Sequence, residues 1–143
     1  MPATTPADPR PGRIQELTKS ECFGLLASGN FGRVAVIDDH GPVIFPVSFV
    51  LDRHTVVFRT EPGAKLHAAG QGSRVCFEAD GTDAAGRTAW SVIVRGEITE
   101  VTEPAELARL RTLPLQVQAP GIRNHYLKIL PATLTGRRIV TAG

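Results

Sequence analysis

The segment from Phe58 to Leu66 concentrates side chains that can hold an anion. It reads Phe-Arg-Thr-Glu-Pro-Gly-Ala-Lys-Leu, an extended run that ends in Arg59 and Thr60 and turns into a helix with Lys65 near its start. A guanidinium, a hydroxyl and an ammonium beside the unpaired N–H groups of a helix start would bind phosphate. The same residues also fit an ordinary exposed turn with solvated cations.

Pro46 interrupts an apolar run, Val43 to Val50, that is otherwise typical of a core strand. Proline has no N–H to donate to a neighbouring strand, so it belongs at a sheet edge or a bulge. Backbone groups around Pro46 and Val47 then stay available, and such groups can hydrogen-bond the edge of a planar heterocycle.

Trp90 is the only tryptophan and begins another apolar run. It fits a residue of the core or its rim, and it also fits a stacking partner for a flat ring. In the same run, Arg95 and Gly96 indicate a β-bulge or the tight closure of a barrel.

No pattern in the sequence indicates a metal site or a redox-active thiol. Cys22 and Cys76 lie far apart, outside any Cys-x-x-Cys spacing, and the four histidines never fall at the i, i+4 spacing of a helical metal pair. We therefore expect no metal site and no disulfide. No convincing acid–base pair stands out either, so no catalytic residue is assigned.

Six strands and three helices must position these groups. The helices are expected from a Thr18–Glu21 capping box to Gly29, over Ala64–Ala69, and over Ala105–Leu113. β-branched and aromatic runs between turn residues predict strands at Phe31–Ile37, Pro42–Leu51, Thr55–Arg59, Val75–Ala79, Ala89–Val101 and Tyr126–Leu130. Their connections are too short for parallel crossovers, which favours an antiparallel barrel.

Length and composition predict one domain. The chain has 143 residues, 42% of them hydrophobic and 21% charged, and four prolines within the first eleven. We expect a disordered tail over residues 1–13 and a folded domain over 14–143. A net charge of +2 argues against nucleic acid as a partner, and no apolar run is long enough to span a membrane, so a cytoplasmic protein is expected.

Several of these motifs occur together in one known family. The sequence from residue 16 to 140 resembles the pyridoxamine 5'-phosphate oxidase-like flavin-binding split barrels, particularly the short actinobacterial members. The resemblance rests on Gly32–Ala35, Pro42–Phe49, Phe58–Lys65, Trp90–Gly96 and Gly136–Arg138.

The resemblance implies a mainly β fold with flanking helices, built on a six-stranded antiparallel split β-barrel. It also implies a homodimer with FMN in a cleft between the subunits. The expected cofactor contacts are the FMN phosphate at Arg59, Thr60 and Lys65, the ring edge along Pro46 and Val47, and Trp90 near the ring or in the cleft wall.

One departure narrows the function. Pyridoxamine phosphate oxidases carry an Arg-x-His substrate motif near the C-terminus, whereas the only Arg-x-His here, Arg123-Asn124-His125, precedes the sixth expected strand. We therefore expect a different small-molecule substrate, with reduced nicotinamide as a candidate electron donor to FMN. A deazaflavin-dependent reductase remains an alternative, as does a non-catalytic carrier or sensor of flavin or, less expected, haem.

Overall fold

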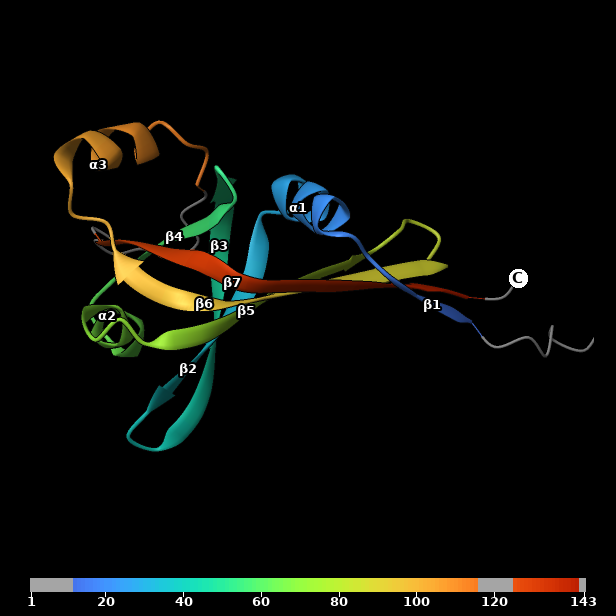
Figure 1. Cartoon of the computed structure of the whole chain (residues 1–143), viewed down its shortest axis with the longest axis horizontal. Coiled ribbons are helices and arrows are strands. Elements are labelled where there is room, and N and C mark those ends of the chain that lie inside the picture. The colour runs from blue at the N-terminus through green and yellow to red at the C-terminus, as the bar shows by residue number, and fades with distance from the viewer. Residues whose placement is uncertain (1–11, 116–124, 142–143) are drawn as a thin grey trace, which may run out of the picture.

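The computed structural model describes residues 12–115 and 125–141 (Figure 1). Within these residues the chain forms, in order, β1 (Arg13–Glu16), α1 (Lys19–Ser28), β2 (Phe31–Asp38), β3 (Gly41–Asp52), β4 (Thr55–Thr60), α2 (Ala64–Gly70), β5 (Arg74–Thr82), β6 (Thr88–Glu100), α3 (Pro104–Leu110) and β7 (His125–Val140).

The strands form one antiparallel sheet in the order β1-β7-β4-β3-β2-β5-β6, and β6 pairs again with β7. The strands β2 to β7 therefore close into a six-stranded barrel, and β1 adds to the outside of β7. This confirms the expected mainly β fold and its antiparallel six-stranded barrel.

The closure between β6 and β7 depends on a bulge. Their register shifts between Arg95 and Gly96, and a Cβ at Gly96 would overlap the carbonyl oxygen of Leu130 on β7. Both interpretations of the Arg95–Gly96 pair are thus confirmed, because the bulge and the close backbone approach occur at the same place.

Two hydrophobic cores lie on opposite faces of β4 and β7. The larger core fills the barrel, where Phe49, Phe58 and Phe77 are fully buried. A smaller core lies outside the barrel beneath α3 and consists of Val57, Val101, Leu110 and Tyr126. Alternate residues of β4 and β7 therefore belong to different cores, as the two-residue period of a strand requires.

The helices begin close to where the sequence predicts. At α1, the Thr18 N–H donates to Glu21 Oε1 at 2.9 Å and the Glu21 N–H donates to Thr18 Oγ1 at 3.1 Å, which completes the capping box. α2 extends one residue beyond the expected Ala69, to Gly70. α3 begins at Pro104 and ends at Leu110, three residues earlier than expected.

The two ends of the described chain lie side by side, since β1 pairs with the last part of β7 (Figure 1). Residues 1–11 of the expected tail lie outside the described residues, but Arg13 already pairs with Val140 in the sheet. α1, with ten residues, is the longest helix in the described ranges, and none there is long and apolar enough to cross a membrane.

Candidate functional site

The expected phosphate-binding segment lies at one end of the barrel. β4 ends at Thr60, and α2 begins at Ala64 after a short turn through Gly63. The N–H of His67 donates to the Gly63 carbonyl at 2.9 Å, and α2 packs against β2, β6 and β7. The strand-to-helix junction inferred from the sequence is therefore present.

Arg59 and Thr60 point to opposite faces of β4. The Arg59 guanidinium lies 5.3 Å from the centre of the Tyr126 ring, on the outside of the barrel. Thr60 faces the inside, is 1% exposed, and donates its hydroxyl to the Glu61 carbonyl at 3.0 Å. The two side chains, grouped by the sequence argument, thus do not share one surface.

Lys65 connects α2 to β3. Its Nζ lies 4.8 Å from the centre of the Phe45 ring, in a cation–π contact. Phe45 immediately precedes Pro46, so the structure brings the expected phosphate cation to the strand expected to meet the ring.

Pro46 occupies an edge, as expected. β3 pairs with β2 from Gly41 to Ser48, but with β4 only from Phe49 to Asp52. In its first part, β3 therefore has one strand neighbour and a free side, where a missing N–H costs nothing.

Two neighbours of Pro46 shape this edge differently. Val47 is 3% exposed, so a ligand can meet its backbone rather than its side chain. Ser48 carries a buried Oγ without a hydrogen-bond partner in the described part of the chain. A buried hydroxyl without a partner is energetically costly.

Trp90 lies far from Arg59 along β7. It pairs with Arg138 of β7, whereas Arg59 pairs with Tyr126, twelve positions earlier on the same strand. Twelve strand residues span up to about 40 Å. Trp90 instead lines a pocket of about 490 Å³ formed by β5, β6 and β7. One chain therefore does not bring Trp90 to Arg59.

A histidine–carboxylate pair lies at the same barrel end as Thr60. His125 Nδ1 and Glu100 Oε2 are 2.7 Å apart, and His125 is the direct partner of Thr60 across β4 and β7. No motif in the sequence indicates the pairing of His125 with Glu100. Residues 100 and 125 belong to different strands, so only the register of β6 against β7 could have revealed it.

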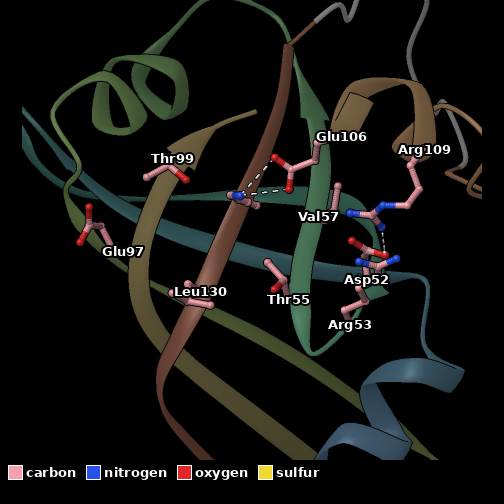
Figure 2. A pocket seen from close by; sticks show the side chains of 10 residues that line it. Asp52, Arg53, Thr55, Val57, Glu97, Thr99, Glu106, Arg109 and Leu130 are labelled. Carbon is pink, nitrogen blue, oxygen red and sulfur yellow. Dashed lines mark hydrogen bonds and ion pairs between the residues drawn. The ribbon is translucent and has the colours of Figure 1, made fainter. Parts of the chain in front are cut away.

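A charged pocket of about 360 Å³ lies between α3 and the outer surface of β4, β6 and β7 (Figure 2). Lys128 donates to Glu106 at 3.0 Å, and Arg109 donates to Asp52. The bond to Asp52 raises the pKa of Arg109. Because these charges pair with one another, they fasten α3 to the barrel. None of the expected cofactor residues lines this pocket.

The sheet also has an outer face, defined here as the side of β1, β2, β3, β5, β6 and β7 that points away from the barrel interior. Cross-strand pairs run over it from Pro46 to Arg33, Glu78, Ile93 and Thr135. Six large apolar side chains of the described residues stand exposed on it, namely Ile14, Phe31, Ile37, Ile44, Leu130 and Ile139.

A small charged cluster interrupts this outer face. Arg33 Nη1 donates to Glu78 at 2.8 Å and to Asp80 at 3.4 Å. Burial raises the pKa of Glu78, and the neighbouring Asp80 raises it further. One arginine thus serves two carboxylates on an otherwise largely apolar surface.

Comparison with known proteins identifies the family. Residues 18–138 match the family described as pyridoxamine 5'-phosphate oxidase. The chain belongs to this family. A protein of Mycobacterium tuberculosis described as uncharacterized matches nearly the whole chain. It is 36% identical over 97% of this chain and 95% of its own length.

Two solved structures resemble the chain over most of its length. The FAD binding protein from Mycobacterium smegmatis is 39% identical, with a TM-score of 0.71, over 87% of this chain and 98% of that one. A candidate pyridoxamine 5'-phosphate oxidase from Corynebacterium glutamicum is 31% identical, with a TM-score of 0.78, over 91% and 96% of the two chains. The resemblance to the split-barrel family, inferred from the motifs, is confirmed.

Proposed function

We propose that this protein binds FMN and acts as a flavin-dependent oxidoreductase on a small molecule. Membership of the oxidase family supports the proposal, as does the relative at 39% identity that is described as an FAD binding protein. The observation that carries it is the contact of Lys65 with Phe45, because it brings an ammonium group to the strand that holds Pro46.

The residues at this edge fit a flavin. The pyrimidine edge of a flavin presents carbonyl oxygens and an N–H, which match the backbone groups of Val47 and the unpartnered Ser48 hydroxyl. The free side of β3 leaves room for a planar ligand to align with the strand. The phosphate would then meet Lys65, while Arg59, on the outside of β4, contributes less directly.

The groups at this edge assign a separate role to the flavin and to each part of the chain. A bound flavin supplies hydride transfer at its ring. Lys65 binds the phosphate, and the β3 edge orients the ring. No residue is assigned to proton transfer at the substrate, and reduced nicotinamide is the electron donor that we propose to test first.

The decisive experiment is the absorbance spectrum and mass of the cofactor that copurifies, followed by titration of the cofactor-free protein with FMN, FAD, riboflavin and a deazaflavin. We expect a flavin spectrum and tighter binding of FMN than of riboflavin. Oxidation of reduced nicotinamide by the loaded protein would distinguish an enzyme from a carrier. A preference for the deazaflavin, or a Soret band from haem, would contradict the proposal.

We further propose that the protein is a homodimer with its cofactor in a cleft between the subunits, and that the second copy packs on the outer face. That face exposes Ile37 and Ile44 on the β2–β3 hairpin, next to Pro46, and it is hollowed by pockets along β5, β6 and β7. A second copy would bury these apolar side chains. It would also bring its own Trp90 to the shared cleft. Obligate interfaces of this kind bury about 2,000 Å² or more.

A further inference from the structure

The inner surface at the α2 end of the barrel carries more polar groups than the phosphate segment alone. Thr60, Glu100 and His125 lie on the same strand faces as the buried residues Phe58, Ile98 and Leu127. Because side chains alternate along a strand, all three point toward the inside of the barrel end. α2, which carries Lys65, packs on β6 and β7 at this end.

The pair of Glu100 and His125 is oriented for a particular role. A carboxylate at Nδ1 fixes the tautomer with a proton on that nitrogen, which leaves Nε2 available for another partner. The His125 side chain is 34% exposed, so a ligand can reach it. A protonated ring would present Nε2–H as a charged donor to an anion.

We propose that His125, oriented by Glu100, is a further phosphate-binding residue of the flavin site and acts together with Lys65. This inference rests on the proposed flavin function. It assigns the protonated imidazole to the same inner barrel end as Lys65 and makes FMN binding dependent on pH.

Other ionisable groups stand on the elements packed at this end. They are Glu100 on β6, Arg59 and Glu61 at and after the end of β4, and Lys65 and His67 on α2. Histidine is the side-chain type that ordinarily changes charge near neutral pH, so a change in FMN affinity between about pH 6 and 8.5 reports on histidine. His67 is the one other histidine on these elements.

The test measures dissociation constants of FMN and riboflavin at pH 6 and 8.5 for the parent chain and His125→Gln. We expect His125→Gln to weaken FMN binding about tenfold at pH 6 and by less than twofold at pH 8.5, since a hydrogen bond to a charged group is lost only where the ring is protonated. Riboflavin binding should change at neither pH. Comparison at equal pH cancels the ionisation of the FMN phosphate itself.

Three further variants sharpen the test. Glu100→Gln keeps an acceptor for Nδ1–H and so the orientation of the ring, and it should weaken FMN binding less than His125→Gln does. His67→Gln and His40→Gln replace exposed histidines, on α2 and in the distant β2–β3 turn, and should keep the parent's pH profile.

The results distinguish failure of the His125 assignment from failure of the proposed flavin function. If His125→Gln weakens FMN equally at both pH values, weakens riboflavin by the same factor, or has no effect, His125 is not a phosphate ligand while the proposed function stands. If the parent chain binds no flavin, both proposals are overturned.

Discussion

The three lysines of the chain occupy different environments. Lys19 begins α1 and is exposed, Lys65 lies over Phe45, and Lys128 donates to Glu106 beneath α3. Only Lys65 stands beside the free edge of β3. The contrast makes Lys19 a matched control for the loss of one ammonium group.

Lys65→Ala should weaken FMN binding by about ten- to a hundredfold, because a charge-assisted hydrogen bond to phosphate contributes roughly 1.5–3 kcal/mol. Riboflavin lacks the phosphate, so its binding should change little. Isothermal titration with both ligands measures the difference. Lys19→Ala should leave both affinities unchanged, and Arg59→Ala should show the same selectivity on a smaller scale. Equal losses of FMN and riboflavin in Lys65→Ala would point to damage of the pocket instead.

Glu78 gives the chain a predictable response to pH. Its pKa is raised in the folded state, so the folded state binds the proton more tightly and loses stability as pH rises through that pKa. Glu78→Gln removes this loss. The melting temperature of Glu78→Gln, relative to the parent, should therefore rise between pH 4 and pH 7. A difference that is constant or falls with pH would contradict the assignment. Glu103→Gln serves as a control, because it makes the same substitution at a carboxylate that caps α3.

At the scale of elements, the glycines differ in whether the structure leaves space for a Cβ atom. Gly96 lies at the β6–β7 bulge against the Leu130 carbonyl, whereas a Cβ at Gly24 on α1 would meet nothing within 4 Å. The same substitution should therefore have opposite effects at the two positions.

Gly96→Ala should lower the free energy of unfolding by about 3 kcal/mol or more, because two backbones must separate to admit the methyl group. Gly24→Ala should raise it by up to about 1 kcal/mol, as expected for an exposed helix position. Urea unfolding followed by circular dichroism measures both changes. A neutral Gly96→Ala would show that the barrel closes less tightly than the bulge indicates.

Local patterns predicted most elements because their causes are local. The capping box at Thr18, the turn chemistry before β3 and the alternation in β6 all act within a few residues. Two parts of β-structure escaped prediction. β7 continues past Pro131, which lies opposite Gly96 at the bulge and so needs no donor. β1 is exposed throughout and has no apolar pattern to reveal it.

In the candidate site, too, local patterns predict some features and miss others. The Lys65 helix and the Pro46 edge follow from short segments. The opposite directions of Arg59 and Thr60, and the pairing of His125 with Glu100, follow from strand register over distances that no local pattern encodes.

At the scale of the whole molecule, the proposed homodimer and the separation of Trp90 from Arg59 along β7 predict a site shared between two chains. Two mixed dimers test it by tryptophan quenching on FMN addition. The first pairs Lys65→Ala with Trp90→Phe chains, and the second pairs the Lys65→Ala/Trp90→Phe double variant with the parent.

A shared site joins Lys65 of one chain to Trp90 of the other, so only the first mixture keeps an intact site that contains a tryptophan. We expect stronger quenching in the first mixture than in the second, at equal FMN occupancy. The reverse order would place the whole site within one chain, and a monomer by light scattering would exclude the shared cleft altogether.

β7 is the last described strand to leave the ribosome, yet it pairs with β1, β4 and β6. Until its sixteen residues emerge, β4 and β6 each keep one unsatisfied edge, and the barrel has no seam to close. Closure of the barrel must then wait for the synthesis of β7, because the contacts that close it join residues far apart in sequence. A nascent chain stalled before residue 125 should consequently present open sheet edges to chaperones and to its neighbours on the same polysome.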